Sequence, residues 1–355
     1  MTAVTSVGAP GVPSPTIVPA TRRRIRLPRS AKVITGATLL AVFVFLAIFG
    51  PALSPYDPNF IATATNGTPQ PPSAAHLLGT TNLQQDILSQ LLAGTRPIML
   101  VAFVAGAVAS VLAVLIGVLA GYFGGLVDDL LSLLINVSLV LPALPLLIVL
   151  TGFLGTSSSA NDPLIALIIA ITGWAWGARV LRVQVLSMRN RDFVESARLI
   201  GERPWRIIGF EIMPSLIPII ASSFLFTVIY AIGTYASLAY LGLISASHWS
   251  WGTMLFWAGS VQAEQSGWWW WFVPPGLAIA LLGMALALLN FGIDEFINPR
   301  LRAAGLSRKA ARGAGLPRRF RLGLTPVTAQ APAGTDAALA GTARDRAIPD
   351  PEISL

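Results

Sequence analysis

The stretch that decides how this chain is organised is DFVESARLIGERPWRIIGFEIMP, residues 192–214, a polar segment between two strongly apolar ones. Asp192 followed three residues later by Glu195 predicts a capping box at the start of a helix. Gly201 predicts that this helix ends at a residue in the left-handed conformation. Pro204 suits the first turn of a second helix, and Pro214 predicts the end of the segment. The stretch therefore predicts a folded pair of helices rather than a simple loop.

The composition on both sides of this pair is that of a membrane protein. The chain has 355 residues, of which 54% are hydrophobic and 11% charged, and its mean hydropathy is +0.69. Soluble domains carry about 25% charged residues. A bilayer core of about 30 Å requires about 20 helical residues, so each apolar run of that length is a candidate span. We expect an all-α polytopic protein with six transmembrane helices, at residues 33–53, 98–121, 130–152, 163–178, 215–243 and 273–293.

The basic residues predict the orientation of these spans. The segment before the first span, the loop 179–214 and the tail after the sixth span hold 23 of the 24 lysines and arginines, the exception being Arg96. Positive residues are concentrated on the cytoplasmic side of membrane proteins. We therefore expect a multi-pass protein of the plasma membrane, with both termini and the 179–214 loop in the cytoplasm. The first apolar run is too long for a signal peptide and predicts an uncleaved anchor.

The domain organisation follows from these assignments. Residues 1–32 and 299–355 are basic, low in helical periodicity, and expected to be disordered cytoplasmic tails. Residues 33–97 contain the first span and an exterior loop, in which the apolar residues between 83 and 92 form a stripe that would lie flat on the membrane. Residues 98–298 form the transmembrane core, with the loop 179–214 on its cytoplasmic side.

Two further patterns are expected to serve packing and anchoring. Gly117 and Gly121 have the spacing of small residues that lets membrane helices approach closely. The run Trp268 to Trp271 precedes the sixth span and predicts an aromatic belt at the exterior headgroups, with substrate stacking as the alternative. Both patterns indicate membrane packing more directly than chemistry.

The sequence contains no recognisable catalytic or nucleotide-binding motif. Neither Lys32 nor Lys309 lies in a G-x-x-x-x-G-K-[ST] phosphate loop, and no H-E-x-x-H or G-x-S-x-G motif occurs. The chain has no cysteine, and His76 and His248 fall in different exterior loops. We expect no catalytic residue, no cofactor and no metal site. The six spans contain no ionisable residue, which argues against a proton-coupled carrier, whereas a carrier that binds Na⁺ through backbone carbonyls stays open.

Three interpretations of the helix pair at 192–214 remain. Its arginines, Arg198, Arg203 and Arg206, could lie against lipid phosphates while the helices rest on the headgroups. A DNA-binding helix-turn-helix is the second interpretation, but the pair is tethered at both ends to spans and has no third helix. In the third, the pair is a docking element for a separate soluble protein that supplies energy.

The residues of this pair carry a resemblance. The segment is similar to the E-A-A-x-x-x-G-x9-I-x-L-P loop of permease subunits of ABC importers, with matches at Glu195, Ala197, Gly201 and Pro214. It departs from this pattern at Ser196, Glu211 and Met213. Other stretches resemble the second ("C-type") permease of dipeptide, oligopeptide and nickel importers, and they begin at His76, Ser237, Trp251, Pro275 and Asn298. The resemblance covers about residues 75–302.

The resemblance implies a type I ABC importer permease fold and a division of labour. Such a permease is a non-catalytic transport subunit that pairs with a second permease subunit, with two ATP-binding subunits at the cytoplasmic face and with an exterior substrate-binding protein. Asp192, Glu195, Ala197, Gly201 and Pro214 would then belong to the coupling loop that docks the ATPase. Glu195 would either contact the ATPase or cap its own helix. The implied function is ATP-driven uptake of dipeptides, oligopeptides or similar solutes; the alternative is a stand-alone channel or a cation-coupled carrier.

The exterior stretch departs from the family in charge. After the sequence His76 to Thr80 the family continues with an acid and then Gly-Arg-Asp, whereas this chain has Thr81, Gln84 and Gln85 before Asp86. Two charges are therefore missing. The change is either neutral or alters the exterior gate or the contact with the binding protein.

Overall fold

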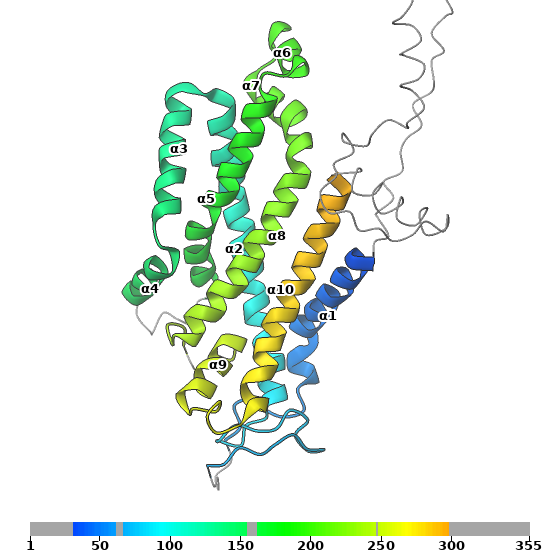
Figure 1. Ribbon diagram of the computed structural model, residues 1–355, viewed down its shortest axis with the longest axis vertical. Helices are drawn as coiled ribbons and strands as arrows, with labels where there is room; N and C mark the ends of the chain where they lie inside the picture. Colours follow the sequence, from blue (N-terminus) through cyan, green and yellow to red (C-terminus); the bar gives the residue numbers. More distant parts are fainter. Residues whose placement is uncertain (1–30, 62–66, 155–161, 246–247, 298–355) are drawn as a thin grey trace, which may run out of the picture. The chain divides into compact units, whose positions relative to one another are not determined.

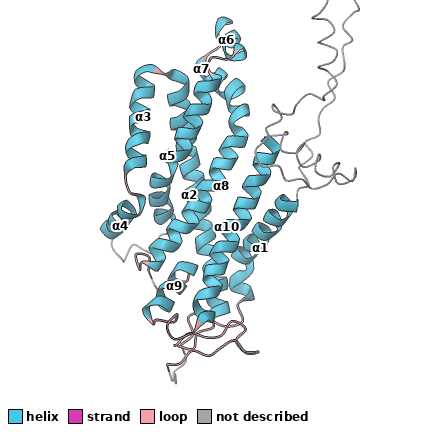
Figure 2. Cartoon of the chain, viewed as in Figure 1, coloured by secondary structure: helices cyan, strands magenta, loops and turns pink. Residues whose placement is uncertain are grey.

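The computed structural model describes residues 31–61, 67–154, 162–245 and 248–297, and this part of the chain consists of helices and loops (Figure 2). Both predicted tails, except Ala31 and Lys32, lie outside the described residues. Five helices form most of the bundle (Figure 1): α1 (Ala31–Leu53), α2 (Ile87–Phe123), α5 (Asp162–Met188), α8 (Met213–Tyr240) and α10 (Trp269–Ile297).

The expected number of spans agrees with the structure if one broken span is counted. Four of these helices, together with the continuous helical segment from Pro204 to Tyr240, are long and apolar enough to cross a membrane. The sixth candidate is the pair α3 (Gly125–Val140) and α4 (Ala143–Leu154), whose axes differ by 87°.

The span expected at 130–152 is therefore present as a broken span, formed by α3 and α4. Leu141 adopts an extended backbone, with φ −63° and ψ 128°, immediately before Pro142. A residue before proline avoids the helical region because the proline ring collides with its backbone. The helix ends there, and α4 starts in a new direction.

The helix that contains the second expected span begins at Ile87, before that span. The Asp86 side chain caps α2 by accepting a hydrogen bond from the Ser89 backbone N–H at 2.8 Å. Ile87 is buried and Leu92 nearly so, because both pack in the core of the bundle. The expectation of an apolar stripe lying flat on the membrane is thus wrong for these residues: they form the first turns of α2.

The centre of the bundle is the contact between α2 and α5, and small residues allow it. A side-chain carbon added at Gly117 would lie 2.5 Å from the carbonyl oxygen of Ala178, and one added at Gly121 would lie 2.7 Å from the Cβ of Val185. The close packing predicted from the glycine spacing is confirmed. It holds α5 rigidly against α2 up to the point where the polar helix pair begins.

The polar elements gather at the two ends of the bundle (Figure 1). One end carries α6 (Asp192–Leu199), α7 (Pro204–Arg206) and the π-helical turn η2 (Ile207–Ile212). The other end carries the segment after α1 and the short helix α9 (Trp251–Ser260). We call these the α6 end and the α9 end.

Candidate functional site

The helix α6 starts one residue earlier than its predicted cap allows. Arg191 is the N-cap, and its carbonyl oxygen accepts hydrogen bonds from the N–H groups of Val194 and Glu195 at 2.9 and 3.0 Å. Asp192 is the first helical residue, and no side-chain cap bond is present. The predicted capping box is therefore wrong. Asp192 and Glu195 still place negative charge in the first turn, where the helix dipole favours it.

The end of α6 is as predicted. Gly201 has φ +83°, and its N–H bonds to the carbonyl of Arg198 at 3.0 Å. The N–H of Glu202 reaches back to the carbonyl of Ala197 at 3.1 Å. These two bonds define a Schellman motif, in which the left-handed residue is usually glycine because a side chain would be strained there.

The second helix of the pair is the start of a span and not a separate element. Pro204 occupies its first turn, as predicted, and helical structure continues through η2 into α8 without a gap. The N–H of Met213 bonds to the carbonyl of Ile208, five residues back. This wider turn directly precedes Pro214, which has no N–H to donate. Pro214 lies at the expected end of the polar segment, in the first turn of α8, but it does not interrupt the helix.

The pair is anchored to the ends of α2 and α5 by apolar contacts. Val194, Ile207 and Ile212 are almost fully buried, and they share a core cluster with Tyr122 and Val185. The guanidinium of Arg198 lies 5.2 Å from the centre of the Tyr122 ring, within the range of a cation–π contact. A displacement of α6 would therefore be passed directly to the helices of the bundle.

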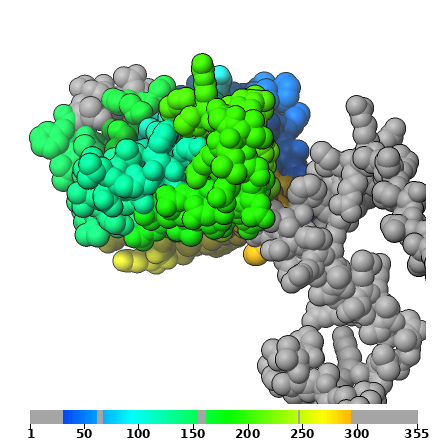
Figure 3. Space-filling view, turned by 90° about the horizontal axis from the view of Figure 1, so that it is seen from above, coloured from blue at the N-terminus to red at the C-terminus, as the bar shows by residue number. Residues whose placement is uncertain are grey.

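The outer surface of the pair is apolar and exposed. In the view from above, the residues around position 200, drawn in green, cover much of this end (Figure 3). Leu199, Ile200 and Phe210 are 84%, 80% and 74% exposed, and Trp205 and Phe193 are exposed as well. Large side chains on helices that the bundle has already anchored indicate a contact surface.

A groove of about 330 Å³ runs between α6 and η2 across this surface. Its apolar walls come from Phe193, Ala197, Ile200 and Phe210. At its rim, Arg206 forms an ion pair with Glu202, four residues earlier. The groove is therefore an apolar slot with a charged edge, which suits one or two apolar side chains of another protein.

The five predicted site residues are only partly brought together. Ala197 is half-buried in the groove, and Gly201 makes the turn beside it. Asp192 and Glu195 are exposed on α6. Pro214 lies outside the groove residues, at the start of α8. Sequence reasoning missed Phe193, Ile200 and Phe210, because exposed apolar residues next to membrane spans look the same as core residues in sequence.

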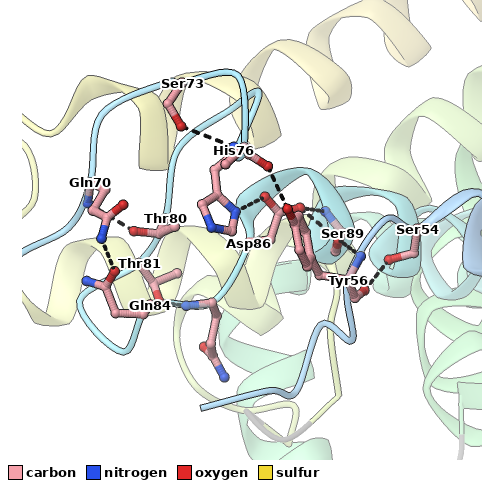
Figure 4. Close-up of polar contacts among 12 residues, drawn as sticks. Ser54, Tyr56, Gln70, Ser73, His76, Thr80, Thr81, Gln84, Asp86 and Ser89 are labelled. Atoms are coloured by element: carbon pink, nitrogen blue, oxygen red, sulfur yellow. Dashed lines mark hydrogen bonds and ion pairs between the residues drawn. The ribbon is translucent and has the colours of Figure 1, made fainter. Parts of the chain in front are cut away.

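The α9 end holds a second polar cluster, shown in Figure 4. The Asp86 carboxylate that caps α2 also lies 3.0 Å from Nδ1 of His76. It accepts a hydrogen bond from the Ser89 hydroxyl at 2.7 Å. The Tyr56 ring packs against the His76 ring in a tilted arrangement, with the ring centroids 4.8 Å apart. Asp86 thus joins the turn at His76 to the start of α2, and Tyr56, in the segment after α1, contacts both Ser89 and His76.

The residues that depart from the family pattern have structural roles in this cluster. Gln84 has φ +60°, a conformation natural to glycine, and its side chain bonds to Gln70 and to the Thr68 carbonyl at 2.7 and 2.8 Å. The Thr81 hydroxyl accepts hydrogen bonds from the N–H groups of Leu83 and Gln85, each at 3.2 Å. Among the described residues, no group of three or more His, Asp or Glu side chains is placed to hold a metal ion.

Comparisons with known proteins give the same picture as the residues. The family model "Binding-protein-dependent transport system inner membrane component" matches residues 113–303, and "N-terminal TM domain of oligopeptide transport permease C" matches residues 23–72. The metal-staphylopine import system permease protein CntC of Staphylococcus aureus (strain NCTC 8325 / PS 47) is 35% identical over 81% of this chain and 97% of its own.

Two dipeptide transport system permease proteins DppC are also similar. The protein of Bacillus subtilis (strain 168) is 30% identical over 78% of this chain and 84% of its own length. That of Alkalihalophilus pseudofirmus is 31% identical over 78% of this chain and 89% of its own. A chain of the inward-facing MetNI methionine ABC transporter aligns with 59% of this chain at 19% identity, with a TM-score of 0.46.

Proposed function

This chain belongs to the family of binding-protein-dependent transport system inner membrane components, and we propose that it is the permease subunit of an ATP-driven importer. A separate ATPase would dock at the pair α6–α7 and drive transport from there. Its cargo would be dipeptides, oligopeptides or similarly sized solutes. The relatives differ in this respect, since two are named for dipeptides and one for metal-staphylopine.

The observation that carries the proposal is the exposed apolar groove between α6 and η2. An energy-coupling contact needs a surface that binds a partner and a rigid route into the membrane. The groove provides the first, and the buried residues Val194, Ile207 and Ile212 provide the second. The Schellman turn at Gly201 fixes the two walls of the groove relative to each other.

The remaining partners follow the same assignment. ATP would be hydrolysed by two ATP-binding subunits and not by this chain. A second permease subunit would complete the pathway, and an exterior binding protein would deliver cargo at the α9 end. The charge distribution supports a cytoplasmic location for the α6 end and for both termini, in the inner membrane.

The direct test is reconstitution with and without partners. The chain would be expressed with its candidate ATP-binding subunits and second permease, purified, and placed in liposomes. We expect co-purification and uptake that requires ATP inside, cargo outside and the binding protein. Uptake by this chain alone would contradict the proposal and favour a channel or a cation-coupled carrier.

A further inference from the structure

A pocket of about 410 Å³ lies at the α9 end, between the exterior loop, the start of α2, α9 and α10. Three indole rings, of Trp249, Trp257 and Trp271, form much of its wall, and Gln85 and Gln90 line it as well. None of the side chains that line the pocket is charged. Such a wall favours a ligand that is flat, polar and neutral.

Two of the residues that line this pocket each have a buried polar atom with no partner among the residues that the structure describes. Gln90 is 0% exposed and Trp271 is 2% exposed. The amide nitrogen of Gln90 donates to the side-chain oxygen of Gln85 at 3.0 Å, which leaves Gln90 Oε1 without a donor. The indole Nε1 of Trp271 is likewise without an acceptor. Buried groups of this kind cost free energy unless something bonds to them.

The Pro58 carbonyl supports this orientation of the Gln90 amide. Gln90 Nε2 donates to that carbonyl oxygen at 3.5 Å as well as to Gln85, and a carbonyl oxygen can only accept. The end of Gln90 that is left over is therefore the acceptor Oε1, whereas Trp271 Nε1 can only donate. The residues that line the pocket thus hold one unpaired donor and one unpaired acceptor within a neutral surface.

Thr81 and Gln85 line the pocket as well. They offer a hydroxyl and an amide, so they provide hydrogen-bonding groups and no counter-charge for an ionised group.

We propose that this pocket binds a peptide group: the peptide carbonyl accepts from Trp271 Nε1, the peptide N–H donates to Gln90 Oε1, and the indole rings cover its faces. A carboxylate or ammonium terminus would find no partner of opposite charge, so the ligand is an internal part of a peptide chain. The inference rests on the proposed function for the source of that chain, which is either the cargo or a loop of the exterior binding protein.

The test uses the full-length permease in nanodiscs, labelled with ¹⁵N-tryptophan. Its 10 tryptophans give separate indole N–H signals, and Trp271→Phe identifies the signal of Trp271. The probe is the neutral tripeptide N-acetyl-Ala-Ala-Ala-amide, added first alone; in a second arm, the peptide-free binding protein is added instead. A saturable shift of the Trp271 signal with the tripeptide supports cargo as the source. A shift only with the binding protein supports its loop.

Variants and a modified probe test the contacts. Gln90→Met is expected to weaken binding about threefold to tenfold, the range for losing one neutral hydrogen bond. Trp269→Phe, in the same tryptophan run but exposed and outside the pocket, is the matched control and should change nothing. If Gln90→Met fails to fold in a melting assay, the fully N-methylated tripeptide tests the same bond on the wild-type protein.

Absence of a saturable Trp271 shift in both arms would overturn the inference, as would equal affinities of the plain and N-methylated tripeptides. The titration needs no ATPase. Its failure is therefore separate from a failure of ATPase co-purification, which would contradict the proposed function instead.

Discussion

Arg182 on α5 forms a bidentate ion pair with Asp128 on α3. Nε of Arg182 lies 2.5 Å from Oδ1 of Asp128, and Nη2 lies 2.8 Å from Oδ2. The Ser132 hydroxyl donates to the same carboxylate at 2.9 Å. This pair fastens the broken span α3–α4 to the helix that leads directly into α6. Paired in this way, a carboxylate and a guanidinium gain both attraction and fixed geometry.

We expect Asp128→Asn to lower the free energy of unfolding by about 1 to 3 kcal/mol, between the values for exposed and buried ion pairs. The measurement is thermal or denaturant unfolding of the purified protein in detergent. Asp129→Asn is the matched control. Asp129 follows Asp128 in the sequence, but it is exposed and forms no ion pair among the described residues. Equal effects of the two substitutions would show that the pair contributes nothing specific.

Gly201→Asp is expected to abolish uptake while the protein remains in the membrane. A side chain at φ +83° is strained by about 1 to 2 kcal/mol, and the new charge lies beside the groove. Uptake and membrane levels would be measured together. Gly209→Asp is the control for the added charge. Gly209 has no positive φ and a side-chain carbon there meets nothing within 4 Å, so this variant adds the charge nearby without straining the backbone. Normal uptake by Gly201→Asp, with the ATPase still bound, would refute the coupling role.

The turn at Gly201 was predictable, and the cap at Asp192 was not, for different physical reasons. Only glycine enters the left-handed region freely, so its position marks the turn to the residue. An aspartate serves a helix start equally well as N-cap or in the first turn, so the sequence leaves a shift of one residue open. Pro214 marks the end of the polar segment but not the end of a helix, because the π turn before it accommodates the proline.

The number of spans was predictable from apolar length, whereas the break in α3–α4 required attention to Pro142 inside an apolar run. The groove was hidden for a deeper reason. Phe193 and Phe210 are apolar like their neighbours, and only their exposure on an anchored helix pair distinguishes them. The pocket at Gln90 likewise depends on segments far apart in sequence that meet at one end of the bundle.

Phe210→Ser should weaken ATPase binding about tenfold or more, because a large aromatic side chain in an apolar groove is a typical hot spot. The measurement is the amount of ATP-binding subunit retained by the immobilised permease at several concentrations. Leu199→Ser is the control: Leu199 is even more exposed but does not line the groove. A larger loss for Leu199→Ser would place the contact on the outer face of α6 instead.

Gly79→Ala should destabilise the α9 end by about 2 kcal/mol or more, because two penalties combine. Gly79 has φ +77°, and an added side-chain carbon would lie 2.6 Å from the Gln70 carbonyl oxygen and 2.7 Å from Cδ1 of Trp270. Gly67→Ala separates the penalties, since Gly67 has φ +66° but open space around it. Unfolding would be followed by tryptophan fluorescence. If both variants lose the same stability, the backbone conformation alone accounts for the effect. A distinctly larger loss for Gly79→Ala shows that crowding by Gln70 and Trp270 adds to it.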